Sequence, residues 1–311
     1  MMSLPKNQAV IVVCGPTGVG KTDLSYLIAR KLPVEIISAD SRQIYKYLDI
    51  GTAKPPKEIL SQIPHHFIDI LYPDQHYSAG QFGIESREVL REIFDRGKMP
   101  LVVGGSGLYI RAMIEGFFNG NDYNSEIRES LQLRLEKEGL ESLYQELLKI
   151  DKKSASKIHP NNSVRILRAL EIYLSTGKPI SKLQAEKLPP LPFPVLKFGI
   201  HKDRRILYQD INMRVDQMFQ RGLLAEVRNI LELGYNKNLN SLKSVGYKEV
   251  IQYIDGKIDF NVCVQQVKQN SRRYAKRQLT WFRNEKDIKW FGINDKNDME
   301  KILSQILKTF M

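Results

Sequence analysis

The sequence predicts an α/β protein in which helices cover a parallel sheet, and a second, all-helical segment interrupts this arrangement. Three observations predict this class. Short apolar runs alternate with helical patterns over residues 1–116, as the strands and crossover helices of a parallel sheet do. Residues 122–186 are charged and helical in pattern and contain no convincing strand. After the proline-rich stretch at 188–194 a strand pattern returns, so we expect the C-terminal part to complete the same sheet.

The strands and helices follow from these patterns in order. We expect a sheet core made of residues 1–116 and 190–311 and a helical insertion at 117–189. Strands are expected in the β-rich runs at 9–14, 34–40, 65–71, 100–105, 195–202 and 288–293. Helices of the core are expected near 22–32, from an N-cap at Ser78 through residue 97, over about 203–234 and 260–286, and at the C-terminus.

A complete phosphate-binding motif follows the first expected strand. The stretch GPTGVGKT, residues 15–22, matches G-x-x-x-x-G-K-[ST], a P-loop whose backbone N–H groups converge on an anion at the start of a helix. Lys21 supplies a point charge, and the Thr22 hydroxyl can join the coordination shell of a magnesium ion. The motif predicts a di- or triphosphate ligand without naming it. The residues expected to bind it are Gly15, Pro16, Thr17, Gly18, Val19, Gly20, Lys21 and Thr22.

Asp40 and Ser106 each follow an expected strand, at the sheet edge where the P-loop begins. Asp40 lies in SADSRQIY after the second strand, and Ser106 lies in GGSGLY after the fourth. Open α/β sheets bind ligands at the carboxyl ends of their strands. A carboxylate there can coordinate metal, accept a ribose hydroxyl, act as a general base or cap a turn, and the spacing does not decide among these. A serine in a glycine-rich strand-to-helix turn is by itself a weak signal.

The charge balance favours a polyanionic partner. Lys and Arg number 47 against 35 Asp and Glu, which gives a net charge of +12. Over 270–283 the sequence NSRRYAKRQLTWFR places two basic ridges side by side on one helix, Arg272 with Lys276 and Arg273 with Arg277. Such ridges can follow a phosphate backbone, and a solvated helix face is the alternative.

Composition excludes several other classes. Cys14 and Cys263 are too few for a disulfide framework or a zinc cluster and suit a reduced, cytoplasmic setting. No apolar stretch approaches the length of a membrane span, so we expect no membrane association. The adjacent His65 and His66 would point to opposite faces of a strand, which favours a structural role over a metal site. Metal chemistry beyond a single ion at Thr22 has no support in the sequence.

Taken together, the quoted segments resemble one family, the bacterial tRNA dimethylallyltransferases, also called tRNA isopentenyltransferases. The P-loop alone would be unspecific, whereas DSRQIYKYLDIGTAKP is close to diagnostic. Two departures are mild, since Ser106 stands where the family usually has Thr and Asn162 where it usually has Asp. The matching stretches recur in the family's order from residue 9 to about 290, and they are 15–22, 40–55, 64–70, 104–109, 165–181, 244–249 and 272–283.

The resemblance implies a P-loop NTPase-like fold and a specific reaction. A dimethylallyl group would pass from dimethylallyl diphosphate to N6 of the adenosine immediately 3′ of the anticodon, in tRNAs that read codons beginning with U, and diphosphate would be released. The P-loop would then hold the diphosphate of a prenyl donor. The expected cofactor is Mg²⁺, and the expected partner is the tRNA anticodon stem-loop. The protein is expected to act as a monomer.

The resemblance also implies roles for individual residues. Asp40 would be the general base that accepts the proton of the adenine amine, and Arg214, in NMRVDQMF, would stabilise the departing diphosphate. Ser106 would hydrogen-bond near the target base, which should be flipped out of the stacked loop. The residues expected to contact tRNA are Asp40, Ser41, Arg42, Gln43, Ser106, Arg165, Ile166, Leu167, Arg168, Ala169, Arg272, Arg273, Lys276 and Arg277.

Two other functions share the P-loop. A small-molecule or nucleoside kinase would need ATP and a phosphoryl acceptor, and DSRQIY gives it no specific support. A non-enzymatic RNA-binding ATPase would need a metal-binding Asp after a strand, but the fourth expected strand ends in glycines. Asp69 could be a substitute for that Asp, although it falls inside an expected buried strand. Both alternatives predict ATP dependence, and the prenyl transferase does not.

Overall fold

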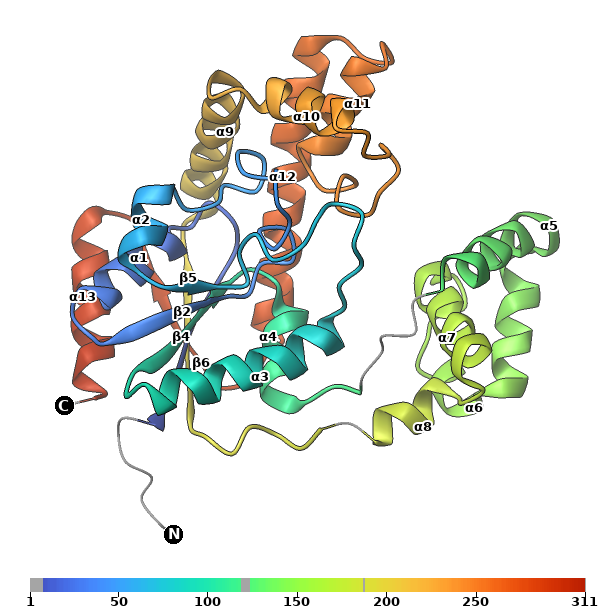
Figure 1. The fold of residues 1–311 in the computed structure, drawn as a ribbon, viewed down its shortest axis with the longest axis horizontal. Helices are drawn as coiled ribbons and strands as arrows, with labels where there is room; N and C mark the ends of the chain where they lie inside the picture. Colours follow the sequence, from blue (N-terminus) through green and yellow to red (C-terminus); the bar gives the residue numbers. More distant parts are fainter. Residues whose placement is uncertain (1–7, 119–123, 187, 311) are drawn as a thin grey trace. The chain divides into compact units, whose positions relative to one another are not determined.

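A single parallel sheet organises the chain. The structure is a computed structural model that describes residues 8–118, 124–186 and 188–310. Within these residues six strands pair in parallel in the order β3-β2-β4-β1-β5-β6. Figure 1 labels β2, β4, β5 and β6 of this sheet. Their bounds are β1 Val10–Cys14, β2 Val34–Ser38, β3 His65–His66, β4 Met99–Gly104, β5 Val195–His201 and β6 Ile288–Gly292. This arrangement confirms the predicted α/β class.

β1 occupies an interior position and has the sequence of such a strand. Its five residues, VIVVC, are all buried, as expected where helices cover both faces of a parallel sheet. Ile11 is in register with Leu101 of β4 on one side and with Leu196 of β5 on the other. Because β5 follows the helical segment in sequence, the C-terminal part completes the sheet that the N-terminal part begins.

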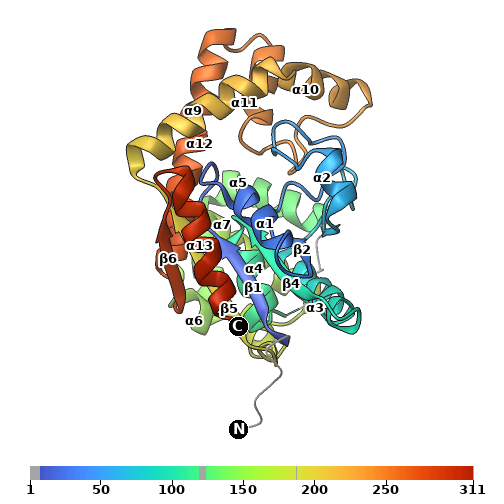
Figure 2. The same ribbon diagram turned by 90° about the vertical axis from the view of Figure 1, so that its left-hand side faces the viewer.

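Helices of the sheet-containing part bury an apolar face against the strands. One core cluster joins Val13 of β1 to Leu24, Ile211 and Ile306, which lie on three different helices. Of these helices, α1 and α13 lie side by side (Figure 2). The helix bounds are α1 Lys21–Ala29, α2 Lys57–Gln62, α3 Ala79–Asp95, α4 Gly107–Glu115, α9 Arg204–Gln220, α10 Leu223–Glu232, α11 Tyr247–Ile254, α12 Phe260–Arg283 and α13 Lys296–Lys308.

A second compact unit is built from helices around its own core. The chain divides into one unit of residues 1–75, 86–110 and 192–311 and another of 76–85 and 111–191. The helices wholly within the second unit are α5 Ser125–Ile150, α6 Lys152–Ala155, α7 Ser163–Thr176 and α8 Ile180–Ala185. Its core includes the buried side chains Leu131, Leu143, Leu147, Ala155, Ile166, Ala169 and Leu170.

Local signals explain where the helices of this unit begin and end. The Asn124 side chain caps α5 by accepting hydrogen bonds from the N–H groups of the first turn, and Asn162 caps α7 by accepting from Arg165 N at 3.2 Å. α7 ends at Gly177, which has the left-handed conformation common at helix ends. The unit extends beyond the expected 117–189, since it also includes residues 76–85, 111–116 and 190–191. Leu191 N donates to Ile114 O at 2.8 Å, where the chain enters and leaves this unit.

Two expected elements differ from those observed, and one observed helix was not expected. β3 covers only His65–His66 instead of 65–71, because the residues that follow include Phe67 and Asp69 with φ of 65° and 56°, a conformation that no strand accommodates. The expected helix over 203–234 is two helices, α9 and α10, because Gly222 between them has φ 99°. α11 was not expected at all.

Candidate active site

Three loops that carry sequence-predicted residues leave the sheet at one edge. β2, β4 and β1 are consecutive neighbours and parallel, so their carboxyl ends lie in a row. Asp40 follows β2, Ser106 follows β4, and the P-loop follows β1. The crevice outside the carboxyl ends of parallel strands is where open α/β folds bind ligands. The topology therefore brings these predicted site residues to a single region.

The P-loop leaves backbone N–H groups available for an anion. Gly15 permits a close approach to β5, since a Cβ at this position would lie 2.5 Å from Ile200 O. Gly20 has φ 99° and precedes α1 without a side-chain cap. Within the described part of the chain, no protein acceptor pairs with the N–H groups of Gly18, Val19 or Gly20. With the positive dipole end of α1 behind them, these groups form the kind of cradle that binds phosphate.

Lys21 lies folded over the P-loop. Its Nζ donates to Gly15 O at 3.0 Å and to Pro16 O at 2.8 Å. Burial lowers the pKa of Lys21 to about 8, while the charge of Asp40 acts in the opposite direction and that of Arg214 adds to the lowering. An anion bound beside Nζ would favour the charged form of this lysine.

Arg214 reaches the P-loop from α9. Its NH1 atom donates to Thr17 Oγ1 at 3.1 Å. Burial lowers the pKa of the Arg214 guanidinium, and the nearby Asp40 charge opposes that shift. Arg214 and Lys21 thus place two cations beside one carboxylate, which is a charge distribution suited to an anionic ligand.

Asp40 and Ser106 are joined through one turn. Asp40 Oδ1 accepts from Arg42 N at 2.9 Å and from Gln43 N at 3.4 Å, whereas its Oδ2 has no hydrogen bond among the residues described. Ser106 Oγ accepts from Ser41 N at 3.0 Å. The structure therefore holds the carboxylate by one oxygen and leaves the other open to a ligand.

Gln278 of α12 connects the P-loop to the Ser106 turn, and the sequence analysis did not single it out. Its Oε1 accepts from Thr17 N at 2.8 Å, and its Nε2 donates to Gly105 O at 2.9 Å. A Cβ on Gly105 would lie 2.1 Å from that Nε2, so a larger residue at this position would displace the Gln278 amide. The side chain is buried. The one signal in the sequence was that Gln278 is an uncharged amide on the side of α12 opposite its exposed basic residues.

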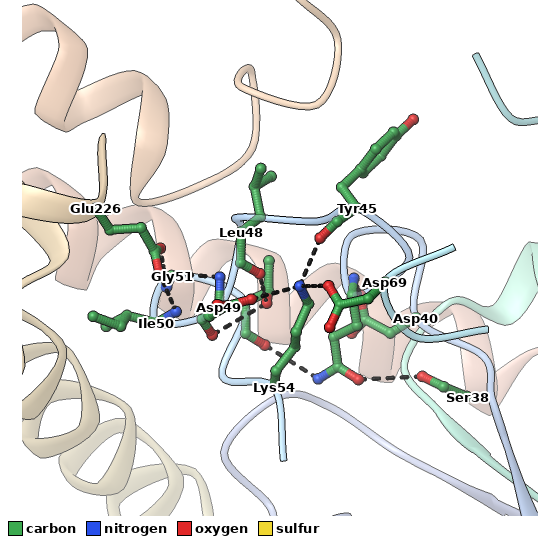
Figure 3. Close-up of polar contacts among 12 residues, drawn as sticks. Ser38, Asp40, Tyr45, Leu48, Asp49, Ile50, Gly51, Lys54, Asp69 and Glu226 are labelled. Carbon is green, nitrogen blue, oxygen red and sulfur yellow. Dashed lines mark hydrogen bonds and ion pairs between the residues drawn. The ribbon is translucent and has the colours of Figure 1, made fainter. Parts of the chain in front are cut away.

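The segment after Asp40 folds into a compact loop over residues 41–54 (Figure 3). Gln43 Nε2 donates to Thr52 O and to Ala53 O, each at 3.2 Å, and its Oε1 accepts from Ser38 Oγ at 3.2 Å. One side chain thus links the end of β2 to the far end of the loop.

Lys54 closes the same loop from inside. Its nearly buried Nζ donates to Tyr45 O at 2.6 Å and to Asp49 Oδ1 at 2.6 Å, and it also pairs with Asp69 (Figure 3). Asp69 is therefore an ion-pair partner at a left-handed backbone position and not a residue of a buried strand, which corrects the expectation for the 65–71 run.

Glu226 of α10 anchors the loop from a distant part of the chain. Its carboxylate accepts from Asp49 N at 3.0 Å, Ile50 N at 2.7 Å and Gly51 N at 3.1 Å (Figure 3). The Tyr247 hydroxyl donates to it at 2.6 Å. Glu226 was not predicted from the sequence, because it lies about 175 positions along the chain from the loop it contacts, as in the pair Gly51 and Glu226.

The four basic side chains predicted on α12 differ in their exposure to solvent. Arg272 is half-buried and donates to Asn212 Oδ1 of α9 at 2.6 Å. Arg273, Lys276 and Arg277 are exposed, and the Arg277 guanidinium lies over the Tyr274 ring at 5.6 Å. Three of the four predicted cations thus reach solvent, while the fourth holds two helices together.

The predicted residues of α7 belong to the helical unit. Arg165 is exposed, and Leu167 and Arg168 are half-buried; Arg168 pairs with Glu171 at 3.1 Å. Ile166 and Ala169 are buried in the core of this unit, so their side chains are unavailable to a ligand.

The adjacent histidines make structural contacts. His66 Nε2 lies 2.8 Å from Glu35 Oε2, and His65 Nδ1 lies 2.6 Å from Ile63 O, which are structural contacts. Across residues 8–118, 124–186 and 188–310, no three His, Cys, Asp or Glu side chains converge as metal ligands. Among the helices described, none is both long and apolar enough to cross a membrane.

Comparison with known proteins identifies the family of this chain. Residues 43–285 match the family described as IPP transferase. The chain belongs to the IPP transferase family. Curated relatives also cover the P-loop and Asp40: tRNA dimethylallyltransferase from Natranaerobius thermophilus is 45% identical over 98% of this chain and 94% of its own length, and that from Pelotomaculum thermopropionicum is 44% identical over 99% and 98%.

Solved structures of IPP transferases have the same fold. The full-length tRNA isopentenylpyrophosphate transferase from Bacillus halodurans is 37% identical, with a TM-score of 0.71 over 97% of each chain. A eukaryotic dimethylallyltransferase acting on tRNA is 30% identical, with a TM-score of 0.77 over 96% of this chain and 77% of the other. The likeness thus extends across nearly the whole of this IPP transferase.

Proposed function

We propose that this protein is an enzyme that transfers a dimethylallyl group from dimethylallyl diphosphate to tRNA. The acceptor is N6 of the adenosine immediately 3′ of the anticodon, in tRNAs that read codons beginning with U. Membership of the IPP transferase family, with full-length relatives named tRNA dimethylallyltransferase, is the observation that carries this proposal. The geometry at the carboxyl edge of the sheet supports it, because a phosphate cradle and an open carboxylate oxygen lie there together.

The reaction needs a base and a stabilised leaving group. The adenine N6 attacks C1 of the dimethylallyl group, the bond from C1 to the diphosphate oxygen breaks, and one N6 proton passes to Asp40. A base is needed because the lone pair of this amine is delocalised into the ring. Asp40 Oδ2 suits the task, since Oδ1 is already fixed by the N–H groups of Arg42 and Gln43.

The P-loop binds the diphosphate in this proposal. The N–H groups of residues 18–20, Lys21 and Arg214 neutralise the charge that gathers on the leaving group. Their contacts support this role, because Lys21 and Arg214 both hydrogen-bond to the loop. Ser106, whose Oγ accepts from Ser41 N, would hydrogen-bond near the target base.

A magnesium ion fits beside Thr22 with a single protein ligand. Thr22 is exposed in the first turn of α1, next to Lys21. Mg²⁺ is commonly held by few protein oxygens together with substrate phosphates and water. When bound, the ion would add positive charge at the diphosphate.

Contacts with tRNA are proposed for the exposed members of the predicted set. Arg165 on α7 and Arg273, Lys276 and Arg277 on α12 reach solvent and can meet phosphates. The residues Ser41, Arg42 and Gln43 border Asp40 and would line the pocket of the flipped adenosine.

An assay without ATP tests the function. The protein, a tRNA transcript with an anticodon for a U-initial codon, magnesium and dimethylallyl diphosphate should yield N6-dimethylallyladenosine, detected by mass spectrometry after nuclease digestion. The same transcript with guanosine 3′ of the anticodon is the matched control and should give no product. A strict requirement for ATP, or a phosphorylated product, would contradict the proposal and favour a kinase.

A further inference from the structure

Three tyrosines, of which two are exposed, form an aromatic surface that the proposed chemistry does not use. Tyr47 and Tyr72 are 41% and 42% exposed. The Tyr47 ring centroid lies 6.1 Å from that of Tyr72 and 6.1 Å from that of Tyr235. We call these three rings, with the Lys46 side chain beside them, the tyrosine platform. Lys46 Nζ lies 4.2 Å from the centroid of the Tyr72 ring.

Tyr47 occupies a backbone conformation that disfavours its own side chain. Its φ is 68°, in the left-handed region that glycine adopts readily and that crowds the Cβ of other residues. A bulky residue held in this way, with its ring open to solvent, contributes little to a core. Non-glycine residues held in strained backbone conformations cluster at functional sites.

Hydrogen bonds connect the three chain segments that carry the platform. Tyr45 and Leu71 form a parallel bridge, and Lys46 N donates to Leu71 O at 2.8 Å, which fixes Tyr47 and Tyr72 relative to each other. Ser241 Oγ donates to Pro73 O at 2.7 Å and brings in the segment that follows Tyr235.

The platform is also linked to the candidate active site. Arg42 donates from its backbone N to Asp40 Oδ1 and from its side chain to Asn240 O at 2.9 Å. One residue thus ties the turn of the proposed base to the segment between Tyr235 and Ser241. A ligand on the platform would lie on the same body of the protein as Asp40.

We infer that the tyrosine platform stacks an unpaired base of the substrate tRNA. This inference rests on the proposed function, because flipping one adenosine out of a loop removes a stacking partner from its neighbours. Aromatic rings bind such bases by stacking, and a nearby cation suits the attached phosphate. Lys46 supplies that cation, and it has no carboxylate within ion-pair distance anywhere in the described chain.

The test is equilibrium binding of the tRNA transcript, measured by fluorescence anisotropy with Tyr47→Gly and Tyr72→Ala. Tyr47→Gly should weaken binding by between about fivefold and about a hundredfold, the range measured when stacking aromatics are removed. Its melting temperature should change little, because glycine suits the left-handed backbone. Neither variant should alter the salt dependence of binding, whereas Lys46→Met should flatten the slope of log K against log salt by about one.

A matched control comes from another cluster of rings. Phe260 is 42% exposed and packs edge to face against Phe219 and Tyr253 at 5.5 Å, and no cation lies over these rings in the described structure. Phe260→Ala should bind tRNA as the wild type does. Equal tRNA affinity for Tyr47→Gly, Tyr72→Ala and wild type would overturn the inference. A change in oligomeric state, seen by light scattering, with tRNA affinity intact would instead identify the platform as a protein contact and also overturn it.

Failure of the proposed function has a different signature. Wild-type protein that binds tRNA but forms no prenylated nucleoside would contradict the reaction, and the binding comparison among variants would still decide the platform. Wild-type protein that prenylates tRNA, with platform variants whose KM for tRNA is unchanged, would contradict the platform alone.

Discussion

At the scale of single residues, one oxygen of Asp40 is fixed and the other is open. Asp40→Asn keeps an acceptor at Oδ1 for Arg42 N, so the turn should survive. The amide cannot accept the proton from adenine N6, and we expect single-turnover prenyl transfer to fall by roughly a hundredfold or more, with tRNA and donor affinities within a few-fold of wild type. Asp23→Asn, an exposed Asp on α1, is the control. An undiminished rate would exclude Asp40 as the base.

Gln278 gives a second prediction at this scale. In Gln278→Glu one carboxylate oxygen can still accept from Thr17 N. The other oxygen would replace Nε2, which donates to Gly105 O in the wild type. We expect a loss of about 1–3 kcal/mol in unfolding free energy, together with a slower transfer step, because a buried carbonyl loses its donor. Gln269→Glu, exposed on the same helix, should change neither quantity in denaturant unfolding and transfer assays.

At the scale of elements, the loop over 41–54 depends on α10. Glu226→Gln replaces a carboxylate that accepts three N–H groups and one hydroxyl by an amide whose NH₂ cannot accept. We expect faster hydrogen exchange at residues 49–51 and a lower transfer rate, because Thr52 and Ala53 hold Gln43 beside Asp40. Glu232→Gln, exposed on α10, is the control. Unchanged exchange at 49–51 would show that Glu226 does not hold the loop.

Regular elements could be predicted from the sequence wherever local periodicity decides them. The strands at 10–14 and 195–201 and the P-loop between strand and helix follow from apolar runs and glycine spacing. The 65–71 run also looked like a strand, but its backbone turns left-handed at Phe67 and Asp69, where Lys54 and neighbouring segments determine the path. Glu226 and Gln278 were missed for a related reason, because a side chain that supports a distant loop leaves no local pattern.

At the scale of the whole molecule, the net charge is +12. Some of the basic side chains are available to contact RNA, and others form ion pairs within the fold. Arg165 is exposed, whereas Arg168 pairs with the buried Glu171, so Arg168 has a structural contact that the sequence did not reveal. We expect Arg165→Ala to weaken tRNA binding, to flatten the salt slope by about one and to spare dimethylallyl diphosphate binding. Lys137→Ala on α5 makes the same charge change elsewhere on the helical unit. Identical slopes for the Arg165 and Lys137 variants would remove Arg165 from the interface.

The position of Lys21 has a consequence for proton exchange with the solvent. Because burial lowers its pKa to about 8, part of the free protein carries a neutral lysine in mildly alkaline solution. A bound diphosphate would raise that pKa again, so binding near pH 8 to 9 should take up a fraction of a proton from the buffer. Titration calorimetry with inorganic diphosphate, in two buffers of different ionisation enthalpy, measures this uptake directly. The apparent enthalpies should differ for the wild type and should agree more closely for Lys21→Met.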